Sequence, residues 1–78
     1  MKNLKVVETE FNIAVGKRIR EQREKLGMTQ AKLAEIVDMD SVSIYRTENG
    51  IVKSSGFAIK NISDALGVST DYLLCKEE

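Results

Sequence analysis

Residues 29–50 contain two short helical patterns separated by a tight turn, and this spacing limits the chain to a steep packing of two helices. Thr29 suits the N-cap of the first helix. Apolar residues then recur at helical spacing, at Leu33, Ala34 and Val37. The pattern predicts a helix over about residues 30–37. Ala34 lies at the centre of its inward face, where a small side chain lets a second helix approach closely.

The second pattern predicts a helix over about residues 41–49, with Asp40 or Ser41 as its N-cap. Asp38 stands in the turn between the two helices, where the chain needs a residue that tolerates a left-handed backbone. One side of the second helix carries Ile44, Thr47 and Glu48. The other side carries Ser41, Val42, Tyr45, Arg46 and Asn49. Asn49 and Gly50 are stop signals.

The rest of the chain predicts three further helices, so the fold class is all-α. The first is expected from about Asn12 to Leu26, with Val15, Ile19 and Leu26 at helical spacing. Ser54 or Ser55 caps a helix through Leu66, whose inward positions are Ala58, Ile59, Ile62, Ala65 and Leu66. A fifth helix is expected over 70–74, where Tyr72, Leu73 and Leu74 can close the core or meet a second subunit. The N-terminal arm is the competing candidate for the dimer surface. A compact five-helix domain over 11–74 follows, with an arm or helix extension at 1–10 and a tail at 75–78.

Composition narrows the function classes. Seventy-eight residues make one small domain. The chain has no His and a single Cys, Cys75, so the sequence predicts no internal disulfide, no metal site, no cofactor and no enzyme. There is neither a membrane-length apolar run nor a signal-peptide pattern, so we expect a soluble, cytoplasmic protein that binds no membrane and no small-molecule ligand.

Three blocks, GKRIREQREKLGMTQAKLAEI, SIYRTENG and ISDALGVSTDYLL, occur in an order and spacing that are specific together. From about Val15 to Leu74 the chain resembles the phage-repressor, Cro-like (XRE) helix-turn-helix family. The resemblance implies a repressor-like fold and a DNA-binding transcriptional regulator. Two departures are Asp38, where the family usually has Gly, and Thr47, where a larger apolar residue is common.

The resemblance also implies which residues read bases. Ser41, Val42 and Arg46 match the family's base-reading positions, and Tyr45 is their neighbour. Because the major groove of B-DNA displays a distinct pattern for each base pair, Arg46 can pair with guanine and Val42 can pack on a thymine methyl group. Ser41 can donate or accept, and Tyr45 can reach a base, a sugar or a phosphate.

Phosphate contacts are expected from residues that flank the second helix of the motif. Gln30 is the best candidate, because it lies at a helix N-terminus and the family commonly uses the matching glutamine in this way. The further candidates are Ser43, Asn49 and Lys53. The family also implies an ion pair between Arg23 and Glu48, which would hold the second helix at its angle and present Arg23 towards a phosphate.

Net charge argues against DNA binding, because 12 basic and 12 acidic residues cancel. The charges are polarised along the chain, however. Residues 1–26 contain seven basic and four acidic residues, and residues 27–78 contain five and eight. A neutral domain with such a field can bind DNA, but its non-specific binding should be weak and salt-sensitive.

Three functional hypotheses remain open. The first is a transcriptional regulator, most simply a repressor, that binds double-stranded DNA at a palindromic operator as a homodimer, because one domain reads only a few base pairs. The second is an antitoxin-like autoregulator or a restriction-modification controller. The third is a protein-interaction module on the same fold, for which the zero net charge is the best support. Gln30, Arg46 and Asn49 together favour the first.

Overall fold

The computed structural model describes the backbone of residues 4–76 and the side chains of residues 7–76, and this part of the chain contains helices and turns but no strand. The helices are α1 (Leu4–Lys25), α2 (Gln30–Ile36), α3 (Ser41–Glu48), α4 (Gly56–Leu66) and α5 (Thr70–Leu73). The predicted all-α, five-helix fold is confirmed.

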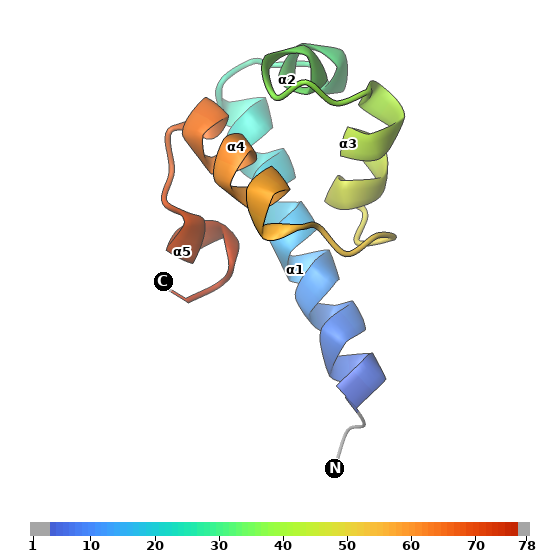
Figure 1. The fold of residues 1–78 in the computed structure, drawn as a ribbon. Helices are drawn as coiled ribbons and strands as arrows, with labels where there is room; N and C mark the ends of the chain where they lie inside the picture. The colour runs from blue at the N-terminus through green and yellow to red at the C-terminus, as the bar shows by residue number, and fades with distance from the viewer. Residues whose placement is uncertain (1–3, 77–78) are drawn as a thin grey trace.

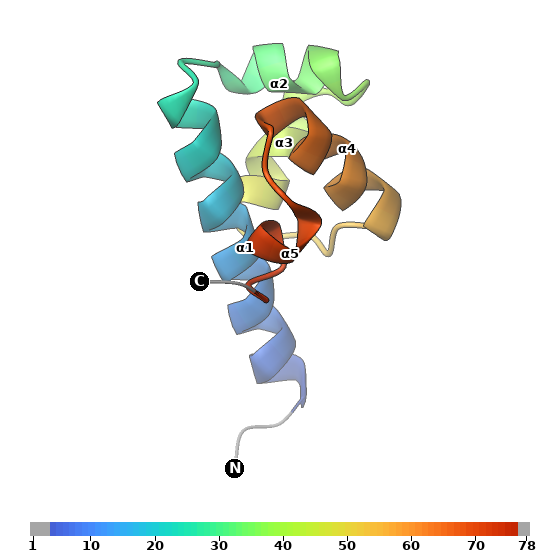
Figure 2. The same cartoon turned by 90° about the vertical axis from the view of Figure 1, so that its left-hand side faces the viewer.

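The long helix α1 runs along the domain and extends beyond it (Figure 1). Its C-terminal half packs against α3, α4 and α5, and α2 packs against α3 and α4. The N-terminal half of α1 projects beyond the body of the domain in both ribbon views (Figures 1 and 2). This projection explains why the molecule measures 40 Å along its longest axis and only 26 and 20 Å across.

Each of the four later helices begins at a side chain that caps it. The hydroxyl oxygens of Thr29, Ser55 and Ser69 and the carboxylate of Asp40 each accept a hydrogen bond from the backbone N–H three residues later. These oxygens satisfy amides that have no partner within the helix. Of the alternatives left open by the sequence, the N-caps are therefore Asp40 and Ser55.

The turn between α2 and α3 depends on Asp38, which has a φ of 57°, in the left-handed region. This backbone lets the N–H of Met39 donate to the carbonyl oxygen of Ala34 at 2.8 Å, which ends α2 tightly. Asp38 fills the role predicted for it. Thr47, the other departure from the family, is buried, and its hydroxyl donates to the carbonyl oxygen of Ser43 at 2.8 Å.

The hydrophobic core lies where all five helices meet. It consists of Val15, Ile19, Leu33, Ala34, Val37, Ile44, Ile59, Ile62, Leu66 and Leu73. Leu73 is fully buried, so it closes the core, while Ala58 and Ala65 are half-buried. Gly16 lies at the crossing of α1 and α3, where a Cβ atom would overlap the backbone carbonyl oxygens of Thr47 and Glu48.

The predicted boundaries are wrong at the start of α1. The helix begins at Leu4 and not at Asn12, so residues 4–10 of the expected arm form the alternative, a helix extension. Adding a turn to an existing helix costs little, because nucleation is the expensive step. Residues 1–3 of the expected arm and residues 77–78 of the expected tail lie outside the described residues.

Smaller corrections concern helix ends and one core position. Leu26, expected on the buried face, is 52% exposed, because α1 ends at Lys25 and the chain then turns away. Helices α2, α3 and α5 each end one residue earlier than predicted, since their last predicted residues are the C-caps Val37, Asn49 and Leu74. Differences of this size are usual at frayed helix ends.

Candidate DNA-binding surface

The outward face of α3 carries all four predicted base-reading residues, Ser41, Val42, Tyr45 and Arg46, and all four are exposed. Val42 and Tyr45 are 54% and 52% exposed, although burial would favour both side chains. The opposite face of α3 is buried through Ile44, Thr47 and Glu48, as the helical period predicts. The helix therefore presents a polar and aromatic face from a rigid support.

A hollow of about 310 Å³ lies beside this face, between α3 and the start of α4; we call it the α3–α4 hollow. It brings together three predicted contact residues, Ser43, Arg46 and Lys53. The sequence interpretation missed its other wall, which includes Met39, Ser55 and Ala58. No local pattern could reveal this wall, because residues from the turn before α3 and from the start of α4 come together only in the tertiary structure.

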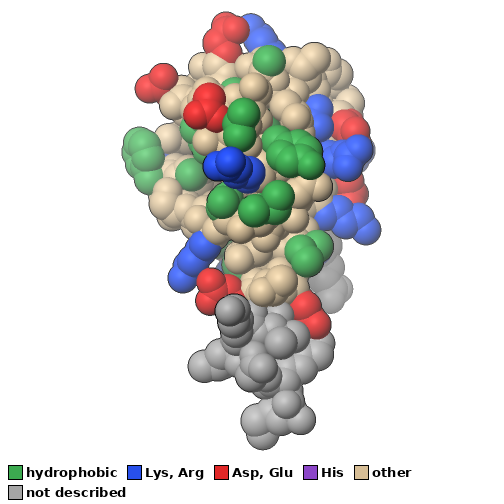
Figure 3. All heavy atoms as spheres, turned by 90° about the vertical axis from the view of Figure 1, so that its right-hand side faces the viewer, with side chains coloured by type: hydrophobic (Ala, Val, Ile, Leu, Met, Phe, Trp, Pro, Cys, Tyr) green, Lys and Arg blue, Asp and Glu red, His purple; other side chains and the backbone are tan. Residues whose placement is uncertain are grey.

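Figure 3 shows the side of the molecule on which α3 lies. A basic side chain lies near the middle of this face among hydrophobic side chains and uncharged surface, while the other basic side chains and most acidic ones lie towards its edges. This central positive charge attracts a polyanion locally although the chain as a whole is neutral.

Arg23 and Glu48 are brought together in a buried, bidentate ion pair. The Nε atom of Arg23 donates to Oε2 of Glu48 at 2.6 Å, and Nη2 donates to Oε1 at 2.9 Å. The hydrogen bond to Glu48 is the main reason why the pKa of Arg23 is raised above its ordinary value. Nη1 donates to the carbonyl oxygen of Met28 at 2.8 Å. The guanidinium group is thus engaged inside the domain and is not presented to solvent as a phosphate contact.

Gln30 joins the same network, which the sequence interpretation did not foresee. Its Nε2 atom donates to Oε1 of Glu48 at 3.1 Å, so Glu48 on α3 accepts from side chains on both α1 and α2. We call Arg23, Gln30 and Glu48 the buried network. Gln30 is half-buried at the first position of α2, and its internal bond holds the side chain in place beside the α2 N-terminus.

Of the remaining phosphate candidates, Asn49 and Lys53 follow the C-terminal end of α3, and Ser43 lies in its first turn. Asn49 is exposed and donates through Nδ2 to the carbonyl oxygen of Tyr45 at 2.8 Å. Lys53 is largely exposed, and its Nζ atom lies 4.0 Å from Oε1 of Glu8. Ser43 is half-buried within α3. Asn49 and Lys53 are therefore in reach of a ligand that lies along α3, whereas Ser43 offers only part of its side chain.

Asp40 places a negative charge at the N-terminus of α3. Its carboxylate accepts from the backbone N–H of Ser43 at 2.7 Å. Hydrogen bonds from Ser43 chiefly lower the pKa of Asp40, and the nearby Arg46 lowers it further. The carboxylate stays ionised at neutral pH, where it stabilises the helix start but repels phosphate. A DNA backbone is therefore better accommodated towards Lys53 than towards Asp40.

Among the described residues, no helix is long and apolar enough to cross a membrane. The same part of the chain contains no group of three or more His, Cys, Asp or Glu side chains that could hold a metal ion.

Comparison with known proteins agrees with this geometry. A family model described as helix-turn-helix matches residues 19–73. The HTH-type transcriptional regulator ImmR of Bacillus subtilis is 33% identical over 66 residues, which are 85% of this chain and 52% of ImmR. The repressor protein C2 of Salmonella phage P22 is 38% identical over 77% of this chain and 28% of the repressor. The chain thus spans about half the length, or less, of these relatives.

Two solved structures are similar over nearly their whole length. The P22 c2 repressor, in complex with a synthetic operator, superimposes with a TM-score of 0.77 at 36% identity, covering 81% of this chain and 96% of the repressor chain. The restriction-modification controller C.AhdI of Aeromonas hydrophila gives a TM-score of 0.75 at 28% identity, covering 78% and 92% of the two chains. The fold and the outward face of α3 define a helix-turn-helix protein. The chain belongs to the phage-repressor, Cro-like (XRE) branch of the helix-turn-helix family.

Proposed function

We propose that this protein is a sequence-specific, DNA-binding transcriptional repressor that occupies a palindromic operator as a homodimer, with α3 in the major groove. The observation that carries the proposal is the exposure of Ser41, Val42, Tyr45 and Arg46 on one face of a helix whose other face is buried. A helix in the major groove reads base edges with such a face. The same proposal includes a cytoplasmic location and no enzymatic activity.

The division of labour on this surface follows from chemistry. Arg46 offers two parallel donors to the O6 and N7 atoms of a guanine, and Val42 offers a methyl contact to thymine. Lys53 and Asn49 contact phosphates on the C-terminal side of α3. Gln30 contacts a phosphate at the N-terminus of α2 while Glu48 holds its side chain.

A second candidate is a restriction-modification controller protein. Its support is the similarity to C.AhdI, 92% of which is covered by this chain. Both candidates use the same DNA contacts, so they differ in the gene that is regulated and not in the mechanism of binding.

Selection of bound sequences from a random DNA pool at low salt tests the DNA contact. We expect an inverted repeat with half-sites about one helical turn apart. Arg46→Ala should weaken operator binding by about 1 to 3 kcal/mol and relax the base preference at one position of each half-site. Lys60→Ala on α4 is the matched control, since it removes one exposed positive charge outside the candidate surface. Recovery of no sequence motif, or equal loss in both variants, would contradict the proposal.

A further inference from the structure

The N-terminal half of α1 carries an apolar stripe that the domain covers only in part. Val7 and Phe11 lie one helical turn apart and are 46% and 41% exposed, and Ala14 continues the same face. Ordinary soluble helices turn such a stripe towards a core. The stripe runs into the body of the domain, where Phe11 lines a pocket with Ile59 and Leu74 and Ala14 is half-buried.

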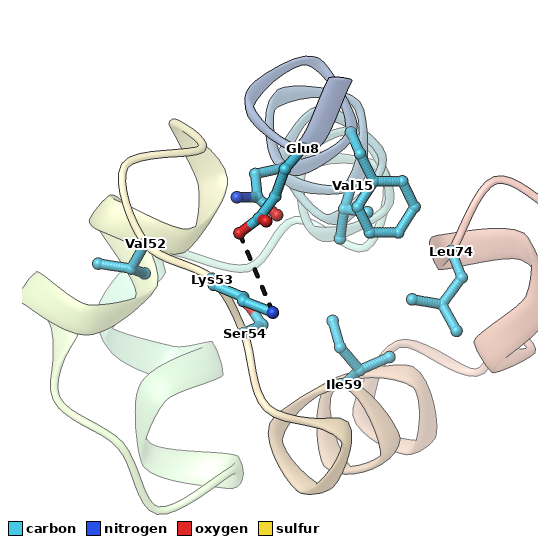
Figure 4. Close-up of a pocket in the computed structure, with 9 residues that line it drawn as sticks. Glu8, Val15, Val52, Lys53, Ser54, Ile59 and Leu74 are labelled. Atoms are coloured by element: carbon cyan, nitrogen blue, oxygen red, sulfur yellow. Dashed lines mark ion pairs between the residues drawn. The ribbon is translucent and has the colours of Figure 1, made fainter. Parts of the chain in front are cut away.

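The stripe borders a largely apolar groove of about 260 Å³, which we call the α1 groove. Its apolar lining comes from Phe11 and Val15 on α1, Val52 in the loop after α3, Ile59 on α4, and Leu74. Figure 4 shows Val15, Ile59 and Leu74 pointing into one space from three separate elements. The ion pair between Glu8 and Lys53 lies at the same groove (Figure 4).

The charges along α1 indicate what covers this surface. The N-terminal half of α1 has a small acidic excess and the C-terminal half a basic one. Residues 4–14 carry Lys5, Glu8 and Glu10, whereas residues 15–25 carry five basic and two acidic residues, which are Lys17, Arg18, Arg20, Arg23 and Lys25 with Glu21 and Glu24. A second α1 lying antiparallel across the stripe brings each acidic half against a basic half. A parallel α1 brings like charges together, which is unfavourable. Charge complementarity therefore selects a second copy of this chain in the antiparallel orientation.

Helix geometry places specific residues opposite each other in that arrangement. Glu10 and Lys17 are seven residues apart, so both lie on the same flank of the stripe. When two antiparallel helices cross between these positions, Glu10 faces Lys17 of the partner subunit, and the contact occurs twice because the interface is two-fold symmetric.

We propose that the stripe formed by Val7, Phe11 and Ala14, together with the α1 groove, is the surface on which a second copy of this chain docks, with the two α1 helices antiparallel. The inference deepens the proposed function and rests on it, since the operator is read by two copies. The outward face of α3 stays available, because none of its base-reading residues lines the groove. Three residues of the loop after α3 line both the groove and the α3–α4 hollow: Val52, Lys53 and Ser54.

Sedimentation of the full chain over a range of concentrations, without DNA, tests the surface. Phe11→Asp should weaken self-association by at least about tenfold, because a central aromatic anchor becomes charged. Phe57→Asp is the matched control: Phe57 is 75% exposed and does not line the groove, so the variant should associate like the wild type. Equal association of the Phe11 variant and the wild type, or equal loss in both variants, overturns the proposal.

If Phe11→Asp fails to fold, exchanging the charges of Glu10 and Lys17 provides a second test. Glu10→Lys and Lys17→Glu should each weaken the dimer, and the double variant should regain most of the wild-type association. Failure of the double variant to recover overturns the antiparallel arrangement. Binding to DNA with a single half-site separates this proposal from the proposed function. A folded Phe11→Asp that remains monomeric and still binds one half-site supports both proposals. If the wild type forms the dimer but selects no DNA sequence, only the proposed function is contradicted.

Discussion

Glu48 links three helices through hydrogen bonds of its side chain. Its carboxylate accepts from Arg23 on α1 and from Gln30 on α2, while its own backbone belongs to the last turn of α3. Burying this ion pair has a large desolvation cost, so an apolar replacement of similar volume can be equally stable. The network therefore contributes orientation more than net stability, because it sets the angle at which α3 leaves the domain.

Removal of one partner should nevertheless be costly. Glu48→Ala leaves Arg23 buried and unpaired, and we expect a loss of about 3 to 5 kcal/mol in the free energy of unfolding. Glu24→Ala is the control, because Glu24 belongs to an exposed pair with Arg20 and should cost no more than about 1 kcal/mol. Urea denaturation of both variants measures the difference. Similar midpoints for the two would show that the buried network contributes nothing measurable.

At the scale of elements, α1 crosses α3 closely at Gly16. Without a side chain there, the two backbones meet with no intervening atom, and α3 is held against the middle of α1. Three links thus position the recognition face: the crossing at Gly16, the turn at Asp38 and the buried network. All three fix the orientation of α3 relative to the other helices.

Gly16→Ala should separate α1 from α3, because the added Cβ overlaps two backbone carbonyl oxygens that cannot move independently. We expect a loss of about 1 to 3 kcal/mol, as for other overpacked sites. The melting temperature should fall by about 4 to 8 °C per kcal/mol for a domain of this size. Gly56→Ala at the start of α4 meets no atom and should melt at or above the wild-type temperature. Equal melting temperatures for the two variants would show that the close crossing at Gly16 does not contribute to stability.

For the whole molecule, the balance of 12 basic and 12 acidic residues leaves little long-range attraction for DNA. Operator binding must then depend on a few directed contacts made twice. Docking through α1 supplies the second set of contacts without adding charge. This combination favours specific over non-specific binding, since the latter rests almost entirely on phosphate neutralisation.

Titration of the selected operator at several salt concentrations tests this balance. Lys53→Ala should weaken all sites similarly and reduce the slope of log K against log salt by about one for each copy. Lys60→Ala should leave the slope unchanged, since Lys60 lies outside both the hollow and the groove. An unchanged slope for Lys53→Ala would place Lys53 away from the phosphates.

Interactions between residues close in the sequence determine much of the secondary structure of this protein. The helical period, the caps and the left-handed turn at Asp38 depend on residues within four positions of one another, so the five helices and the two faces of α3 could be predicted. The base-reading and phosphate assignments came from the resemblance to the family and remain predictions that the DNA experiments test.

The tertiary structure decided what depends on residues distant in the chain. The bond from Gln30 to Glu48 spans 18 residues, and the α1 groove combines side chains from residue 8 to residue 74. The sequence left residues 1–10 as either an arm or a helix extension, and the structure extends α1 to Leu4, which adds Val7 and Phe11 to the apolar stripe. Packing of separate helices, and not the preference of any one segment, set the angle of α3 and left this stripe exposed.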